Sequence, residues 1–338
     1  MIGWLAFAAF FLTNVGIYGI LALGLNAQYG LAGLANFGYV ALFAAGAFTA
    51  ALVLVPPSPA ASPETATAVA GGLGLPFPVA LAGAAAVGGL FALVMGAVSL
   101  RLGGHSLAIV TFAFAQIFGA FLAGEDWLTG GQFGISPVPQ PLRGLVGSAV
   151  DYLFLYLGVT LVIVAGCFWL AERAAGSPFG RVLRGIREDE TAARSLGKNT
   201  GSFKLSAFVL GGVLAGLAGA MWVGSIGSVH VGQFVPIVTF NVWLAVLLGG
   251  IGNNRGVLLG AFLLICIREG TRFLEGIPFL AAASAGNPSL LPSLRYVIIG
   301  LALILVVRFA PRGVIPERLR GRGQAAPPEQ IPATEERR

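Results

Sequence analysis

Long apolar runs, separated by short polar stretches, fill this chain from its first residues to about position 310. A helix needs about 20 mostly apolar residues to cross a bilayer, because lipid offers no hydrogen-bond partner to an open backbone group. By this rule we predict about nine spans, at residues 4–25, 36–55, 78–100, 105–123, 149–170, 205–224, 237–252, 256–274 and 293–309. The predicted fold class is all-α, a polytopic transmembrane helical bundle of about nine to ten spans.

Glycines and amides interrupt the apolar pattern near the N-terminus. The stretch "LNAQYGLAGLANFGY" (25–39) carries them where a continuous helix would not, so we predict a broken or re-entrant segment there. Elsewhere the glycines, 50 in all, indicate close helix packing, as in "GGVLAGLAG" (211–219) and "GAAAVGG" (83–89). Residues 56–77, rich in Pro, Ser, Thr and Gly, are typical of an external loop.

The composition supports a membrane protein. Hydrophobic residues make up 57% of the 338 positions and charged residues only 10%, whereas a soluble domain carries about 25% charged residues. A soluble protein of this composition would have almost nothing to solvate its surface. The net charge of +6 does not indicate nucleic acid as a partner, because that inference requires a basic patch on a soluble surface.

The charged residues are segregated along the chain. Residues 171–204 and 308–338 each hold eleven of them, with a net charge of +3 in each segment. The positive-inside rule therefore predicts that both segments are cytoplasmic. With Arg101 and Arg255 at cytoplasmic turns, the predicted N-terminus faces outward, as do residues 124–148 and 275–292.

Two domains follow from this distribution. We predict a transmembrane domain over residues 1–310 and a cytoplasmic tail over 311–338, which has too few large apolar residues to fold and is expected to be disordered. The first 100 residues contain a single charged residue, Glu64. A cleavable signal peptide has a positive n-region, so the N-terminal apolar run is expected to be retained.

The charged segment contains the pattern of an amphipathic helix. Ser177 and Pro178 are typical of a helix start, and Gly197 is typical of a helix end. Between them, apolar residues recur at helical spacing: Phe179, Val182, Ile186, Ala193 and Leu196. Two pairs of opposite charge stand four residues apart, Arg184 with Glu188 and Glu190 with Arg194. We therefore predict one helix over 178–197, outside the membrane.

Three interpretations of this helix stay open on the residues alone. In the first, the helix lies on anionic lipid, although the run Glu188-Asp189-Glu190 is unusual for an interfacial helix. In the second, it is a solvated connector, which is what charge runs usually are. In the third, it docks in a groove of a cytoplasmic partner, with apolar anchors for affinity and charges for orientation.

The segment "TAARSLG" (191–197) resembles the coupling-loop signature of ABC importer permeases, Glu-Ala-Ala, three residues, then Gly, except that Thr191 stands where the glutamate belongs and Glu190 lies one place earlier. The rest of the chain up to the tail resembles the branched-chain amino acid branch of these permeases, and most closely the LivM type. The residues that carry this resemblance are "LALGLNAQYGLAGLANFGYVALFAAGAFTAAL" (21–52), "RLGGHSLAIVTFAFAQI" (101–117), "TGGQFGI" (129–135), "SPFGRVLRGIREDETAARSLG" (177–197), "KLSAFVLGGVLAGLAGAM" (204–221), "LGGIGNNRGVLLGA" (248–261) and "RYVIIGLALILVVRFAPRGVI" (295–315).

The resemblance implies a permease in the bacterial cytoplasmic (inner) membrane that imports an aliphatic amino acid. It implies a homologous permease subunit, two cytoplasmic ATP-binding subunits and an extracytoplasmic solute-binding protein as partners. ATP and Mg²⁺ would bind to the ATPase subunits and no cofactor to this chain, which has no Gly-x-x-x-x-Gly-Lys-Ser/Thr phosphate loop. Residues 171–204 would be the cytoplasmic coupling loop. Its expected ATPase-coupling residues are Phe179, Ile186, Glu190, Thr191, Ala192, Ala193, Arg194 and Gly197.

Polar side chains inside the predicted membrane region are candidates for the translocation path, because burying them in lipid is costly. These candidates are Asn26, Gln28, Asn36, Thr111 and Gln116. Uncharged amides suit a zwitterion, but Asn and Gln also act as hydrogen-bonding glue between helices, and both readings stay open. "TGGQFGI" (129–135) is predicted to be a tight external turn where the binding protein docks, or simply a loop shaped by glycine. Arg268, Glu269 and Arg272 end a predicted span on the outer side, where a local ion pair is expected in preference to a clamp for a substrate carboxylate.

No catalytic constellation emerges from the sequence. His105 and His230 have no second metal ligand at a useful spacing, and Cys167 and Cys266 lie inside apolar segments. We therefore expect no metal site and no enzyme activity. The main alternatives are a secondary transporter driven by an ion gradient, a channel or structural subunit, and a permease of the same family for urea or short amides.

Overall fold

The computed structural model describes residues 2–57, 72–102, 105–273, 290–309 and 313–317. Within these residues the fold is all-α, as predicted, and the only β-type pairing is a single antiparallel bridge between Ile135 and Val229. The long helices are α1 (Ile2–Leu25), α2 (Tyr39–Leu54), α3 (Phe77–Ser99), α4 (His105–Gly124), α6 (Ala149–Gly176), α9 (Thr200–Ile226), α10 (Pro236–Gly249), α11 (Asn254–Phe273) and α13 (Leu290–Phe309). The short helices are the π-helix η1 (Asn26–Leu31), α5 (Asp126–Thr129), the 3₁₀ turns η2 (Arg143–Leu145) and η3 (Val231–Gln233), α7 (Pro178–Glu188) and α8 (Glu190–Ser195).

Six of the described helical segments are long and apolar enough to cross a membrane. They are Gly3–Leu31, Phe77–Ser99, Ser106–Gly124, Ala149–Gly176, Thr200–Ile226 and Val231–Gly249. Helix α2 is apolar but shorter, and α11 and α13 lie where two further spans are predicted. A multispan membrane protein is therefore confirmed, whereas the full number of nine to ten spans stays a prediction.

Helix α9 lies at the centre of the bundle and packs against α1, α2 and α3. Glycines bring these helices close together. A methyl group on Gly88 of α3 would lie 2.5 Å from the Gly212 carbonyl oxygen, and one on Gly219 would lie 2.5 Å from the Phe43 carbonyl oxygen. Neither position has room for a side chain, which confirms the prediction of close glycine packing for 83–89 and 211–219.

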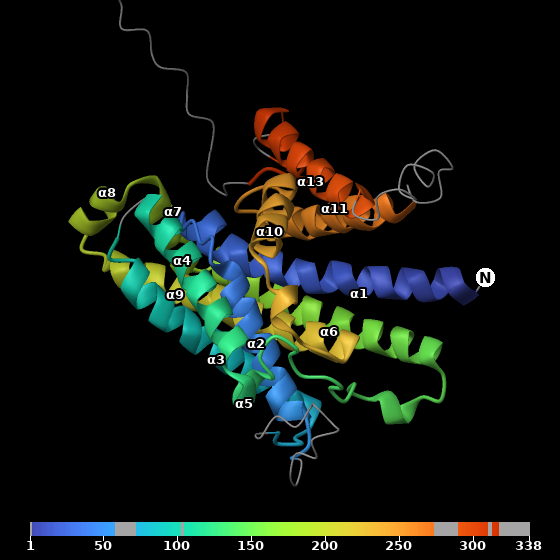
Figure 1. The fold of residues 1–338 in the computed structure, drawn as a ribbon. Coiled ribbons are helices and arrows are strands. Elements are labelled where there is room, and N and C mark those ends of the chain that lie inside the picture. The colour runs from blue at the N-terminus through green and yellow to red at the C-terminus, as the bar shows by residue number, and fades with distance from the viewer. Residues whose placement is uncertain (1, 58–71, 103–104, 274–289, 310–312, 318–338) are drawn as a thin grey trace, which may run out of the picture.

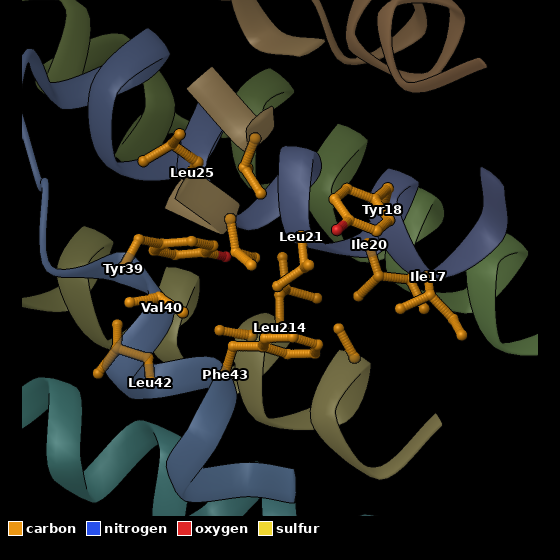
Figure 2. Close-up of a cluster of buried hydrophobic side chains, with 14 of the residues drawn as sticks. Ile17, Tyr18, Ile20, Leu21, Leu25, Tyr39, Val40, Leu42, Phe43 and Leu214 are labelled. Carbon is orange, nitrogen blue, oxygen red and sulfur yellow. The ribbon is translucent and has the colours of Figure 1, made fainter. Parts of the chain in front are cut away.

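The core fills the space between α1, α2 and α9 (Figure 2). Leu21, Tyr39, Phe43 and Leu214 converge there and are almost completely buried. The Tyr39 hydroxyl donates a hydrogen bond of 3.1 Å to the Gly211 carbonyl, so this polar atom is satisfied within the apolar core. The core therefore joins the first two helices to the helix that directly follows α8.

The outer helices present apolar side chains outward. Helix α6 packs along α1, and α10 and α11 pack against each other and against α1 (Figure 1). On the outward faces of α4 and α6, Ile117 and Val162 are both at least 70% exposed. Long helices that leave such residues uncovered are typical of proteins whose surroundings are lipid or other membrane subunits.

The Gly-rich segment at 25–39 is irregular, but its form differs from the prediction. The first helix does not break at Leu25; it continues as the π-helix η1 to Leu31, and only residues 33–38 are non-helical before α2 begins. Gly33 adopts a left-handed conformation with φ +70° in this connection. The segment thus forms the end of the first helix and the turn into the second, and its re-entry into the membrane stays a prediction.

Candidate functional site

Helix α7 begins as predicted and packs on the body of the bundle. The Ser177 hydroxyl accepts a hydrogen bond from the Gly180 N–H at 3.4 Å, and Pro178 occupies the first helical position. Leu183 and Ile186 are buried, and the Phe179 ring stacks on Phe203 of α9 at 5.8 Å between centroids. The apolar face of α7, including the predicted coupling residues Phe179 and Ile186, therefore contacts this chain itself.

A single helix over 178–197 is wrong, because the chain bends at Asp189. This residue has φ −151° and ψ 104°, and its carboxylate accepts a hydrogen bond of 3.0 Å from the Ala192 N–H. An aspartate that caps a new helix competes with continuation of the old one. The segment consequently forms two helices, α7 and α8, joined at an angle.

Helix α8 ends at Ser195, and Gly197 follows it as the predicted stop. Gly197 adopts φ +71°, and its N–H donates to the Arg194 carbonyl at 2.9 Å. The next N–H, of Lys198, donates to the Ala193 carbonyl at 3.2 Å. This pair of bonds is the Schellman motif, in which glycine permits the left-handed residue that stops a helix.

The outer surface of α8 faces away from the bundle. Thr191, Ala192 and Arg194 are exposed, and Ala193 is the buried residue of this short helix. Leu196, directly after α8, is 79% exposed. Figure 1 shows α7 and α8 together at one end of the bundle, far from the N-terminus of α1. We call Thr191, Ala192, Ser195 and Leu196 the α8 surface.

Glu190 fastens α8 to the start of α9. Its carboxylate pairs with Lys204 at 2.5 Å and with Arg194 at 2.8 Å, and it accepts a hydrogen bond of 3.0 Å from the Thr200 hydroxyl. Burial by itself raises the pKa of Glu190. The hydrogen bond and charge of Lys204, with the hydrogen bonds from Thr200 and Arg194, outweigh burial and hold the pKa below its ordinary value.

The predicted ion pair between Arg184 and Glu188 is wrong. Arg184 instead pairs with Glu317 at 2.7 Å and donates to the Ala175 carbonyl at 3.0 Å. The partner comes from the segment predicted to be a disordered tail. Residues 313–317 lie against the end of α10, where the Val314 N–H donates to the Leu248 carbonyl at 2.8 Å; the remainder of 311–338 lies outside the described residues.

Among the predicted path residues, Asn26 is buried at the start of η1. Its amide nitrogen donates to the Asn254 side-chain oxygen at 2.8 Å, and its own side-chain oxygen accepts from the Gly252 N–H at 2.9 Å. Asn26 thus connects the first helix to the turn between α10 and α11.

Gln28 and Asn36 are also buried and bonded to each other. The Asn36 amide donates to the Gln28 side-chain oxygen at 3.0 Å, and the Gln28 amide donates to the Phe208 carbonyl of α9 at 2.8 Å. Asn36 also accepts from the Gly38 N–H at 2.9 Å, and its carbonyl accepts from the Trp243 ring N–H at 3.2 Å. In this conformation these amides act as glue between helices.

The structure does not bring all five path candidates together. We call the buried side chains of Asn26, Gln28 and Asn36 the amide cluster. Thr111 lies next to this cluster, since its hydroxyl accepts a hydrogen bond from the Phe37 N–H, directly after Asn36, at 3.2 Å. Gln116 lies elsewhere, exposed on the outward face of α4. Sequence reasoning overlooked Asn241 of α10, which is buried and whose side-chain oxygen has no hydrogen-bond partner among the described residues. An amide inside the predicted span 237–252 is the signal that could have revealed it.

Arg268 and Glu269 form the predicted local ion pair, at 3.1 Å. Arg268 also donates to the Asn14 side-chain oxygen at 3.2 Å and lies over the Tyr18 ring at 4.8 Å. The pair therefore fastens α11 to α1, which is a structural role.

The segment 129–135 forms a tight turn away from α7 and α8. Gly130, Gly131 and Gly134 all adopt positive φ values between 58° and 74°. The turn ends where Ile135 pairs with Val229, and it projects Phe133, which is 93% exposed. The prediction of a glycine-shaped turn is confirmed, and its docking role stays a prediction.

The six long apolar segments among the described residues indicate a polytopic α-helical membrane protein. The sequence model of the branched-chain amino acid transport system permease component matches residues 7–307. The chain belongs to this family.

Individual relatives agree with the family match. The high-affinity branched-chain amino acid transport system permease protein LivM of Salmonella typhimurium is 32% identical over 326 residues, covering 90% of this chain and 69% of the relative. The probable branched-chain amino acid transport permease protein LivM of Methanocaldococcus jannaschii is 26% identical over 322 residues, covering 90% and 91%. The autoinducer 2 import system permease protein LsrC of Yersinia pestis is 32% identical over 148 residues, 40% of this chain and 39% of the relative. No solved structure matches the chain significantly.

Proposed function

We propose that this chain is the membrane-spanning subunit of an ABC importer and translocates branched-chain amino acids inward, with ATP hydrolysed by separate subunits. The observation that carries the proposal is the α8 surface. A short capped helix that exposes Leu196 beside small and polar residues, in a chain of this family, is suited to insertion into a groove of a cytoplasmic ATPase subunit. The chain itself would bind neither ATP nor Mg²⁺.

The proposed topology follows the positive-inside rule. Nine spans place α7, α8 and the C-terminal segment in the cytoplasm and the turn at 129–135 outside. The solute-binding protein would dock on that outer side, where Phe133 projects, and a homologous permease subunit would cover part of the outward apolar faces. The membrane is the bacterial inner membrane.

The proposed path for the solute runs past the amide cluster. Because Asn26, Gln28 and Asn36 are buried and satisfied by this chain, passage requires a conformation in which these bonds exchange for bonds to the solute. Amide groups suit a zwitterion, and the apolar surroundings suit an aliphatic side chain. The proposed driving force is motion of α8 with the ATPase subunit.

The decisive experiment is uptake of radiolabelled leucine by proteoliposomes that contain the complete complex with its binding protein. We expect uptake that requires internal ATP and is blocked by vanadate. Uptake by this chain without ATPase subunits, driven by a proton or sodium gradient, would instead make it a secondary transporter.

The solute itself needs a separate measurement. The similarity to an autoinducer 2 import permease over part of the chain makes small polar solutes the second candidate class, together with urea and short amides. Calorimetry of the partner binding protein against leucine, isoleucine, valine, urea and acetamide separates them. We expect binding of the branched aliphatic amino acids and none of urea or acetamide.

A further inference from the structure

Helix α7 is connected to the π-helix η1 by one side chain. The Arg187 guanidinium donates a hydrogen bond from Nη1 to the Gly30 carbonyl oxygen. Gly30 belongs to the last turn of η1, where carbonyl groups have no partner within the helix and carry the negative end of the helix dipole. A guanidinium is therefore favourable at this position both as a hydrogen-bond donor and as a positive charge.

Glu317 holds this guanidinium in place. Arg187 Nη2 lies 2.9 Å from Glu317 Oε2, and Arg184 Nε lies 2.7 Å from Glu317 Oε1. All three side chains are at most 24% exposed, so solvent screens the pairs only partly. The carboxylate also lies against Gly252, since a methyl group there would be 2.6 Å from Glu317 Cδ. Glu317 thus fixes α7 against the turn that Asn26 contacts.

The backbone after η1 also fits around Arg187. A methyl group on Gly33 would lie 3.1 Å from Arg187 Cγ and 3.6 Å from Arg187 Cβ. Gly33 has φ +70°, so glycine suits this position for both conformation and space. The end of the first helix therefore contacts Arg187 of α7 at two places, the Gly30 carbonyl oxygen and the backbone of Gly33.

We propose that Arg187 is a positioning residue that transmits movement of α7 to η1, with Glu317 orienting its guanidinium. This proposal rests on the proposed function, in which the ATPase subunit moves α8 and, through it, α7. A π-helix is an uncommon conformation that often marks functional sites. Displacing the Gly30 carbonyl changes η1, whose residues Asn26 and Gln28 hold the amide cluster together.

The first test needs only the purified chain. Hydrogen–deuterium exchange of residues 26–34 is compared in the wild type, Arg187→Ala and Arg101→Ala, the control being an arginine exposed at the end of α3. We expect Arg187→Ala to speed exchange of 26–34 about tenfold, the effect of losing one charge-assisted hydrogen bond, and Arg101→Ala to leave it unchanged. Unchanged exchange in Arg187→Ala overturns the link.

The second test uses the complete complex and measures leucine taken up per ATP hydrolysed. We expect Arg187→Ala to keep ATP hydrolysis and assembly while this ratio falls about tenfold, for the same lost bond. A merely structural role would lower hydrolysis and uptake together. If wild-type uptake needs no ATP, the proposed function fails, while the exchange experiment still decides whether α7 controls η1.

A covalent replacement separates transmission from folding. Gly33→Cys with Arg187→Cys, in a chain with Cys167→Ala and Cys266→Ala, brings two thiols together at a Cβ–Cβ distance of 3.6 Å, which a disulfide spans. We expect copper phenanthroline to restore both exchange protection and the uptake ratio, and dithiothreitol to remove them. Each single cysteine variant is the control. A disulfide that forms but leaves the complex uncoupled overturns the proposal.

Discussion

Helices α7 and α8 come from one charged stretch of sequence, yet they face opposite environments. In α7, Leu183 and Ile186 are buried against the chain's own helices, and two arginines are held by Glu317. In α8, Thr191, Ala192 and Ser195 are exposed, and Leu196 stands 79% exposed beside them. One amphipathic pattern can therefore bury its apolar residues in one half and leave them exposed in the other.

This division corrects the simplest interpretation of the segment. A single rod over 178–197 would offer Phe179 and Ile186 to a partner. Ile186 is instead buried and Phe179 packs half-buried against the bundle, whereas α8, beyond the bend at Asp189, leaves the α8 surface exposed. In the proposed mechanism α8 is the contact point for the ATPase subunit, and α7 joins it to the bundle.

Shortening Leu183 to alanine should have the largest effect on stability. Leu183 has no exposed surface, and a buried leucine-to-alanine change costs about 2–5 kcal/mol. Denaturant unfolding of the purified chain in detergent measures this loss. Leu196→Ala is the matched control and should change the free energy of unfolding by less than about 0.5 kcal/mol. Equal losses in the two variants would contradict the contrast between the helices.

Leu196→Ala should instead weaken the binding of the ATPase subunit. Apolar anchors at the centre of an interface carry much of its affinity, so we expect the Kd to rise roughly tenfold with unfolding unchanged. Titration of labelled ATPase subunits onto nanodisc-embedded permease measures this. An unchanged Kd would show that Leu196 lies outside the interface.

Removing the cap of α8 should loosen that helix alone. Asp189→Ala leaves the Ala192 N–H without its acceptor, at a cost of about 1 kcal/mol. Hydrogen exchange should accelerate at 190–195 and stay constant at 178–188. Asp189→Asn retains a capping oxygen and should behave nearly as the wild type; if it matches the alanine variant, the cap is not what separates the helices.

Acidification should produce the smallest change, confined to the corner between α8 and α9. Because the folded pKa of Glu190 is lower than its unfolded value, its contribution is fully present above the unfolded pKa and is lost as the pH falls through the folded pKa. Exchange at 190–195 should therefore speed up on acidification, after correction for intrinsic rates. Glu190→Gln should flatten this dependence, and a slope that persists would assign it to another group.

Local signals were readable from the sequence because their physics is local. Ser177, Pro178 and Gly197 delimit helices through their own backbone preferences, and the length of the apolar runs located the long helices. The amide cluster was expected from the cost of polar groups in lipid. Each of these features needs only a few neighbouring residues.

Features that depend on distant contacts were not readable. Arg184 finds Glu317 across 133 positions, which overrides the helical partner four residues away. Within the π-helix η1, Asn26 and Gln28 bond to segments remote in sequence, which a one-dimensional pattern does not contain. The bend at Asp189 was not predicted, because the apolar spacing continues past this residue and indicated one continuous helix.

In the proposed mechanism the ATPase subunit binds to α8, and α7 passes the movement on to the bundle without entering the interface itself. Hydrogen–deuterium exchange of the permease, alone and in the assembled complex, separates these two roles. We expect new protection at residues 190–197 and none at 178–188. Protection gained at 178–188 while 190–197 remain unchanged would contradict it.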